Sequence, residues 1–337
     1  MRAAFIHGPY DIRLGELAGR PAPGQIPVAV AAVGICGSDL HYYKEGGIGA
    51  AAQIRAPFVP GHEIAARLLE PLPEKGLAAG SLVAIDPARP CRRCEWCHRG
   101  HVNLCPQVIF TGAPPHHGAM AERLATTPEQ IVPLPPGFTA DQVAMLEPLG
   151  VCIHALDLAR PQYWESVAVL GCGPIGLGIV DLCRLAGVAE LYAIDPVAHR
   201  REAAPRFGAS AVADRPGAIA DWTRGRGVDL VIEATNAPDG FQHAAEAVRI
   251  GGRVVLVGIP DGDAYRLEAA LARRKGLTVR FSRRMGEVYP RAIRLAAAGQ
   301  VDLEGLITHR IGLDGIPEAF AMLADCRDDV VKVMVHP

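Results

Sequence analysis

Residues 34–47, GICGSDLHYYKEGG, concentrate side chains that can bind a metal or move a proton. No separate His–Asn or His–Asp pairing that would activate Cys36 as a nucleophile is evident, so Cys36 is better interpreted as a metal ligand. A hydroxyl followed by an imidazole can carry a proton from a reacting alcohol to bulk water, which makes Ser38 and His41 a candidate relay. Taken alone, His41 would more often be a surface histidine, and Tyr42 a packing residue.

Partners for Cys36 occur in two further motifs. PGHE places His62 and Glu63 after a Pro-Gly turn, and LEPLGV contains Glu147. Thiolate, imidazole and carboxylate ligands hold zinc while leaving one position for substrate, which is the catalytic arrangement. The sequence therefore predicts a catalytic zinc site, and it leaves open whether Glu63 or Glu147 binds the metal directly.

Four of the nine cysteines fall within the single segment CRRCEWCHRGHVNLC. This spacing can supply four thiolates to a closed, tetrahedral structural zinc site. All-thiolate ligation also suits an iron–sulfur cluster, and unrelated buried cysteines are the structural alternative. We predict a structural zinc at Cys91, Cys94, Cys97 and Cys105, in a lobe over residues 88–106.

The motif GCGPIG follows an apolar strand pattern and opens a helical one. Its glycines permit a tight turn, the approach of a pyrophosphate and close helix packing. Asp195 ends the next predicted strand, where a carboxylate binds ribose hydroxyls and repels a 2′-phosphate. NAD is therefore predicted over NADP, although Arg200 could accept such a phosphate. The loop residues assigned to the cofactor are Gly171, Gly173, Pro174, Ile175 and Gly176.

The elements that must position these residues follow two patterns. Up to about residue 145, short strands between Gly- and Pro-rich turns predict an irregular, mostly β domain. Six strands with crossover helices then predict a parallel, doubly wound α/β sheet, and the terminal VVKVMVHP is expected to return to the first domain. The six strand patterns cover residues 166–173, 189–195, 209–214, 228–235, 251–259 and 277–282, and the main helical patterns cover 175–186, 199–207, 218–224, 240–248, 267–273 and 289–298.

Composition excludes several classes of partner. The chain has 337 residues and a formal charge of −2, which gives no reason to expect nucleic acid or an anionic membrane. Its most apolar stretch, residues 166–183, is broken by glycines, a proline and an aspartate, so no membrane span is predicted. The N-terminus lacks the apolar core of a signal peptide. We therefore expect a cytoplasmic protein that acts on small molecules.

These motifs, in this order, resemble the zinc-dependent medium-chain dehydrogenases, in their polyol (sorbitol-type) branch. The resemblance covers nearly the whole chain. It implies a GroES-like catalytic domain over residues 1–146 and 286–337, a Rossmann NAD-binding domain over 147–285, and an active site in the cleft between them. It also implies a homotetramer or homodimer with two zinc sites in each chain.

The resemblance also assigns roles to individual residues. Cys36, His62 and Glu63 would bind the catalytic zinc, with Glu147 reaching it directly or through water. Ser38 and His41 would form the proton relay, Tyr42 and Arg284 would contact substrate, and Thr235, Val257 and Gly258 would contact the cofactor.

The predicted reaction is NAD-dependent oxidation of a secondary alcohol of a polyol or sugar acid to a ketone. The segments GICGSDLHYYKEGG and APFVPGHE are most similar in sequence to the L-idonate 5-dehydrogenase group. Lys44 and Arg284 are cations that could bind the carboxylate of a sugar acid. Sorbitol or xylitol dehydrogenation, L-threonine 3-dehydrogenation and simple alcohol dehydrogenation are the enzymatic alternatives. A catalytically inactive NADH-binding sensor is the non-enzymatic one, and the complete set of ligands and relay residues argues against it.

Three features depart from the family pattern. Asn236 stands where a glycine is usual, and Met285 replaces an aromatic residue beside Arg284. The loop TGAPPHHG carries a His116-His117 pair, which the sequence alone assigns neither to substrate nor to solvent.

Overall fold

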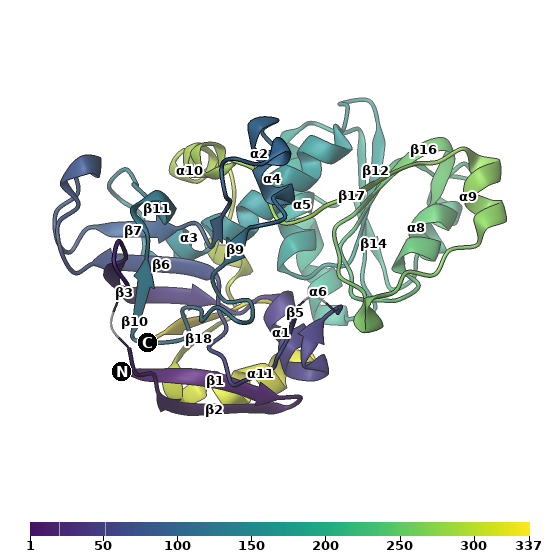
Figure 1. The fold of residues 1–337 in the computed structure, drawn as a ribbon. Coiled ribbons are helices and arrows are strands. Elements are labelled where there is room, and N and C mark those ends of the chain that lie inside the picture. The colour runs from purple at the N-terminus through teal and green to yellow at the C-terminus, as the bar shows by residue number, and fades with distance from the viewer. Residues whose placement is uncertain (20, 51) are drawn as a thin grey trace. The chain divides into compact units, whose positions relative to one another are not determined.

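The computed structural model describes residues 1–19, 21–50 and 52–337, and it divides into two compact units (Figure 1). The first comprises Met1–Glu147, Tyr289–Ala298 and Leu303–Pro337, and the second comprises Pro148–Val288 and Gly299–Asp302. The C-terminal segment thus belongs with the N-terminal one, as expected. The assignment of catalytic and cofactor roles to domains with the predicted boundaries stays a prediction.

The first unit is built around a seven-stranded sheet with the order β11-β7-β6-β3-β19-β18, in which β10 also pairs with β3. Strands β3 and β6 are antiparallel, and β19 pairs with the end of β3, so residues far apart in the chain meet there. The strands are β1 (Arg2–Gly8), β2 (Asp11–Glu16), β3 (Ile26–Gly34), β4 (Gly47–Ile48), β5 (Ala52–Gln53), β6 (Glu63–Leu68), β7 (Leu82–Ile85), β8 (Ala88–Arg89), β9 (Ile109–Phe110), β10 (Arg123–Thr126), β11 (Ile131–Val132), β18 (His309–Gly312) and β19 (Val333–His336).

Short helices complete this unit. They are α1 (Gly37–Glu45), α2 (Glu95–His98), α3 (Ala140–Ala144), α10 (Tyr289–Ala297) and α11 (Ile316–Ala324), with 3₁₀ turns at Pro73–Lys75, Val102–Leu104, Pro128–Gln130, Glu304–Leu306 and Leu313–Gly315. Its core is aliphatic and aromatic: Tyr43 of α1 packs edge-on against Phe320 of α11 at 5.3 Å. In Figure 1 the C-terminal yellow elements lie beside the N-terminal purple strands.

The second unit is a six-stranded sheet with the order β14-β13-β12-β15-β16-β17, and every neighbouring pair is parallel. This confirms the predicted α/β class and doubly wound sheet, whose strand order reverses direction beside β12. The strands are β12 (Ser166–Leu170), β13 (Glu190–Ile194), β14 (Ala211–Ala213), β15 (Val228–Glu233), β16 (Val248–Leu256) and β17 (Thr278–Phe281). The helices are α4 (Leu146–Ala159), which enters from the first unit, α5 (Pro174–Leu185), α6 (Ala198–Ala203), α7 (Ala218–Trp222), α8 (Gly240–Ala247) and α9 (Ala269–Lys275), with 3₁₀ turns at Ala204–Phe207 and Asp261–Asp263.

One boundary differs in an instructive way. The helix predicted over residues 199–207 ends at Ala203 and continues as a 3₁₀ turn. Pro205 has no backbone N–H and its ring crowds the preceding turn, so the α-helix cannot run through it.

The stretch Ala140–Ala159 is the one helical segment of the described residues with the length and composition to cross a membrane. Within the protein, 67% of its apolar window is buried. Core helices have the same character, so this segment is no argument for a membrane span.

Asp229, near the amino-terminal end of β15, is hydrogen-bonded to the amino-terminal end of β12. Its carboxylate accepts hydrogen bonds from the backbone N–H and the hydroxyl of Ser166 at 3.0 and 2.9 Å, and from Arg226 and Arg249 at 2.6 Å each. Burial opposes ionisation, but the hydrogen bonds from Arg226, Ser166 and Arg249 outweigh it and hold the pKa of Asp229 well below its usual range.

We expect Asp229→Asn to lower the free energy of unfolding by about 1–3 kcal/mol at pH 7, because buried donors lose an ionised acceptor. Because the pKa of Asp229 is depressed in the folded state, its ionised form stabilises the fold at pH values above the unfolded pKa of 3.8. The difference in free energy of unfolding between the native protein and Asp229→Asn should therefore become smaller as the pH falls below 3.8. Urea titrations across this range measure the effect, with the exposed Asp221→Asn as control. Equal stability of native protein and Asp229→Asn at pH 7 would contradict the assignment.

Candidate metal and cofactor sites

The structure brings together the thiol of Cys36, a ring nitrogen of His62 and a carboxylate oxygen of Glu63, all within 4.8 Å of one another. Cys36 is the N-cap of α1, just past the end of β3, and Glu63 is the first residue of β6. Gly34 is the antiparallel partner of Glu63, so the pairing of β3 with β6 sets the two ligand segments side by side.

Asp39 connects these two segments. It is fully buried, and its carboxylate accepts the N–H of Cys36 at 3.0 Å and that of Gly61 at 3.2 Å. Asp39 therefore has a structural role in the turn. Its Oδ1 also lies 3.6 Å from His62 Nδ1, a contact that the sequence did not predict. Asp39 therefore orients the imidazole as well as the loop.

A buried lysine that sequence reasoning missed lies against Glu63. Lys332 is 1% exposed, forms an ion pair with Glu63 Oε2, and donates to the carbonyl of Ile35 at 2.9 Å. The signal for it was a lysine inside the apolar run VVKVMV, since lysine is almost never fully buried without a partner. Gly34 makes room for the pair, because an added Cβ there would collide with the Glu63 carboxylate and lie 3.0 Å from Lys332 Cε.

The three-residue cluster fits a divalent metal ion. Among the described residues none hydrogen-bonds His62 Nδ1, although it is shielded from solvent. Burial opposes protonation of His62, but Asp39 and Cys36 outweigh it and raise the pKa of the imidazole well above its usual value. A site that attracts positive charge so strongly, with thiol, imidazole and carboxylate in contact, has the donor set of a zinc site.

Glu147 lies outside this three-ligand group of the described chain. It is buried, and burial raises its pKa to about 7, while the charge of His62 opposes that rise and the charge of Glu63 supports it. Glu147 is therefore electrostatically coupled to the cluster without being one of its three closest members.

The four cysteines of the lobe also converge. The sulfur atoms of Cys91, Cys94, Cys97 and Cys105 lie within 4.8 Å of one another, and none forms a disulfide. The N–H of Cys91 donates to the Cys105 sulfur at 3.3 Å. Four thiols at this separation fit a closed tetrahedral metal site.

The predicted relay residues share helix α1. Ser38 is half-buried and His41 is buried, with Nδ1 3.3 Å from Glu45 Oε1. Tyr42 is 4% exposed, and its ring packs edge-on against Phe58 at 5.2 Å, so its contact with substrate stays a prediction.

Residues 284–285 belong to the second unit. Arg284 has φ = 53°, a left-handed backbone conformation, and is half-buried. Met285 is buried, and an added Cβ at Gly150 would collide with its sulfur, so the flexible thioether packs directly against the backbone of α4. Packing against α4 therefore accounts for a methionine at position 285, where the family usually has an aromatic residue.

The histidine pair has a structural partner. The Nδ1 of His117 accepts the N–H of Val59 at 3.0 Å, and burial followed by the charge of His116 lowers the pKa of His117. Both rings are exposed. His117 therefore anchors its loop to the strand-end segment before PGHE.

The glycine loop lies at the carboxyl end of β12. Gly171 has φ = 91°, and an added Cβ at Gly176 would collide with its carbonyl oxygen, so the turn and the close start of α5 both require glycine. Gly173 is the N-cap and Pro174 opens the helix, where its missing N–H costs nothing.

Asp195 meets this loop directly. Its carboxylate accepts the N–H of Cys172 at 2.7 Å and that of Val197 at 2.8 Å. Arg201, which sequence reasoning missed, donates to the Asp195 carbonyl at 3.0 Å. The acid is thus held at the glycine loop, where an adenosine ribose is expected in this fold.

The next strand ends carry the remaining predicted cofactor residues. Thr235 follows β15, and Val257 and Gly258 follow β16. Asn236 stands where the family usually has glycine, and its side-chain amide donates to the Asp261 carboxylate at 3.1 Å. This hydrogen bond joins the loop after β15 to the loop after β16.

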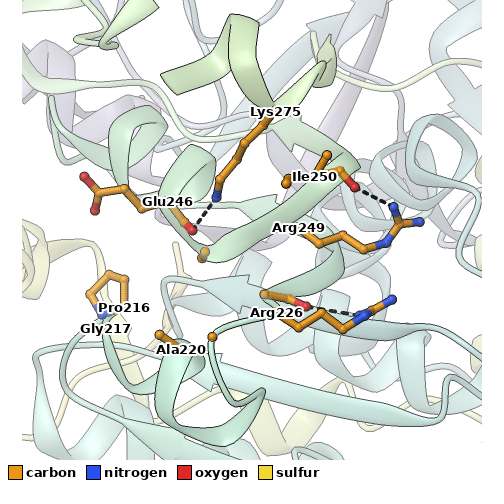
Figure 2. Close-up of a pocket in the computed structure, with 11 residues that line it drawn as sticks. Pro216, Gly217, Ala220, Arg226, Glu246, Arg249, Ile250 and Lys275 are labelled. Atoms are coloured by element: carbon orange, nitrogen blue, oxygen red, sulfur yellow. Dashed lines mark hydrogen bonds between the residues drawn. The ribbon is translucent and has the colours of Figure 1, made fainter. Parts of the chain in front are cut away.

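A pocket of about 480 Å³ lies at the opposite edge of the sheet, before β15 and β16 (Figure 2). Arg226, Arg249 and Lys275 line it, but their donors are committed within the protein. Lys275 donates to the carbonyls of Ala245, Glu246 and Val248, and both arginines bind Asp229. This pocket contains none of the residues predicted to do chemistry.

Comparison with known proteins agrees with this layout. Residues 22–136 match the alcohol dehydrogenase GroES-like domain, and residues 174–298 match the zinc-binding dehydrogenase family. Sorbitol dehydrogenase of Bacillus subtilis is 32% identical over 100% of this chain and 97% of its own length. The chain belongs to the zinc-dependent medium-chain dehydrogenases, in their polyol branch. This confirms the family predicted from the motifs.

Solved structures extend the likeness to three dimensions. L-idonate 5-dehydrogenase from Escherichia coli has a TM-score of 0.90 and 27% identity, with 100% of this chain and 98% of that chain covered. A 2R,3R-butanediol dehydrogenase from Bacillus subtilis has a TM-score of 0.84 and 28% identity, with coverage of 100% and 99%. Other matched structures hold NADH or NADP. The protein is thus an oxidoreductase of a zinc- and NAD(P)-using family.

We expect Gly34→Ala to lower the metal content from about two zinc ions per chain to about one, because the added methyl displaces the Glu63 carboxylate and leaves the four-cysteine lobe untouched. Gly37→Ala is the matched control, since an added Cβ there meets nothing within 4 Å. Elemental analysis with circular dichroism as a folding check measures the outcome. Retention of about two zinc ions by folded Gly34→Ala protein would refute the arrangement.

Proposed function

We propose that this enzyme oxidises a secondary alcohol of a sugar acid to a ketone with NAD, most closely as an L-idonate 5-dehydrogenase does. The observation that carries the proposal is the convergence of Cys36, His62 and Glu63 in a chain that matches L-idonate 5-dehydrogenase over its whole length. A polyol such as sorbitol or xylitol is the second candidate, because sorbitol dehydrogenase of Bacillus subtilis is 32% identical over the full chain. L-threonine stays a further alternative.

Two sets of residues would hold the metals. Cys36, His62 and Glu63 form the proposed catalytic set, with Glu147 beside them, and Cys91, Cys94, Cys97 and Cys105 form the structural set. Zinc held by the first set supplies Lewis-acid polarisation of the substrate hydroxyl. Asp39 and Lys332 keep the imidazole and the carboxylate of that set in place.

Ser38 and His41 are proposed to move the proton released by the alcohol. They lie three residues apart on α1, a spacing that places two side chains on the same face of a helix. Glu45 Oε1 lies 3.3 Å from His41 Nδ1, where an ionised carboxylate can accept an N–H and so favour the tautomer with the proton on Nδ1.

Substrate contacts are proposed for Tyr42 and Arg284. A guanidinium can form a charge-assisted, bidentate pair with a sugar-acid carboxylate, and Lys44 adds positive charge on α1. A homo-oligomeric, cytoplasmic enzyme remains part of the proposal.

Cofactor choice can be tested first. Because Asp195 repels a 2′-phosphate, kcat/KM for NAD should exceed that for NADP by at least about tenfold, or roughly 1.4 kcal/mol. Asp195→Ala should narrow this gap, and Arg200→Ala serves as the comparison. Equal efficiency with both cofactors in the native protein would refute the role of Asp195 and favour Arg200 as a phosphate ligand.

The substrate assignment rests on a second measurement. We expect kcat/KM for L-idonate to exceed that for sorbitol by on the order of tenfold to a hundredfold, since a neutral polyol leaves the arginine without its anionic partner. Arg284→Gln should remove most of this preference for L-idonate. The control variant Arg283→Gln, at an exposed neighbouring residue, should keep it. A panel that includes xylitol, L-threonine and short alcohols completes the test. Native protein that turns over sorbitol as well as L-idonate would reject carboxylate recognition and leave a polyol dehydrogenase.

A further inference from the structure

Glu233 is a buried acid that has no role in the function proposed above. It ends β15 and is 1% exposed. Its Oε1 accepts the backbone N–H of Thr235 at 2.7 Å and also the Thr235 hydroxyl. Its main-chain carbonyl accepts the N–H of Val257 at 2.8 Å and that of Gly258 at 3.2 Å. All three of these partners are predicted cofactor contacts.

Two glycines lie so close to Glu233 and Thr235 that neither position has room for a side chain. An added Cβ at Gly240, the first residue of α8, would lie 2.7 Å from Glu233 Oε1 and 2.9 Å from Thr235 Oγ1. At Gly258 it would collide with the Thr235 carbonyl oxygen. Two glycines therefore allow the acid, Thr235 and the end of β16 to approach one another.

Thr235 connects the acid to the phosphate-binding turn. A Cβ added at Gly171 would lie 3.0 Å from Thr235 Cγ2 and 2.7 Å from the Ala234 carbonyl oxygen. The Thr235 hydroxyl donates to Glu233 and accepts the N–H of Ala237 at 3.1 Å, so it is committed within the protein. A shift of Glu233 would therefore move Thr235 against the glycine loop.

The second oxygen of the carboxyl group is different. Across the described residues nothing hydrogen-bonds Glu233 Oε2, which is shielded from solvent. A buried carboxylate with one oxygen unpaired is costly, which disfavours its ionisation. Burial raises the pKa of Glu233 in spite of the hydrogen bonds from Thr235. Oε1 can accept both hydrogen bonds from Thr235 whether or not the carboxyl group is ionised.

We propose that Glu233 is the positioning residue of the cofactor site, where its Oε1 acts as the acceptor that sets Thr235, beside the Val257 and Gly258 N–H groups held by its main-chain carbonyl, in the arrangement that receives NAD(H). The inference rests on the proposed placement of the cofactor against these three residues. It predicts that cofactor affinity depends on an acceptor at this position and not on negative charge.

The test compares NADH dissociation constants of zinc-loaded native protein, Glu233→Met, Glu233→Gln and Glu165→Met, from the fluorescence of bound NADH. Methionine removes the acceptor from two donors and should raise the dissociation constant about tenfold. Glutamine retains one carbonyl oxygen and should stay within about twofold of native. Glu165 is a buried acid before β12 that pairs with Arg253 at 2.6 Å, so Glu165→Met should lower thermal stability without weakening NADH binding.

Several outcomes would overturn the inference: native affinity in Glu233→Met, equal losses in the glutamine and methionine variants, or an equal loss in Glu165→Met. If Glu233→Met does not fold, Thr235→Val removes one donor to the same oxygen with little change in shape. That variant should also weaken NADH binding, and an unchanged dissociation constant would overturn the inference as well. Native protein that binds neither NADH nor NADPH would reject the proposed function itself, and this inference with it.

Discussion

The antiparallel pairing of Gly34 with Glu63 is the constraint on which the candidate metal site depends. It places the end of β3 beside the start of β6, and so brings the loop that carries Cys36 to the turn that carries His62. Asp39 then accepts an N–H from each segment, and Lys332 balances the charge of Glu63 from a third strand segment. The three proposed metal ligands therefore depend on the register of β6 against β3. A shift of β6 by one residue would turn the Glu63 side chain to the other face of the sheet.

Both candidate sites use glycine in the same physical way, to let a carboxyl group lie against a backbone. Gly34 does this for Glu63, and Gly240 does it for Glu233. Both acids are buried; Glu63 pairs with Lys332, which is distant in the chain, whereas Glu233 accepts from Thr235, two residues away. In both places a residue without a side chain sets how closely an acid can approach the main chain.

Much of the layout could be read from local sequence. Cysteine spacing located the four-cysteine cluster, and apolar strand patterns located all six strands of the parallel sheet, because period and ligand spacing are short-range signals. Lys332 and the second role of Asp39 could not be located in this way. Their partners depend on tertiary contacts across 269 residues for Lys332 and 23 residues for Asp39, with His62. Glu233 follows the apolar pattern of its strand, and nothing in that pattern shows that its carboxyl group accepts the N–H and hydroxyl of Thr235.

The position of Lys332 also bears on the order in which the contacts around Glu63 form during synthesis. The motifs that contain Cys36 and His62 emerge early, whereas the cation that pairs with Glu63 follows 269 residues later. Strand β19 must also cross back to β3 after the whole second unit has been made, and contacts so distant in the chain form late because closing a long loop costs entropy. The contact of Lys332 with Glu63 and the pairing of β19 with β3 are therefore expected to form after the second unit has been synthesised.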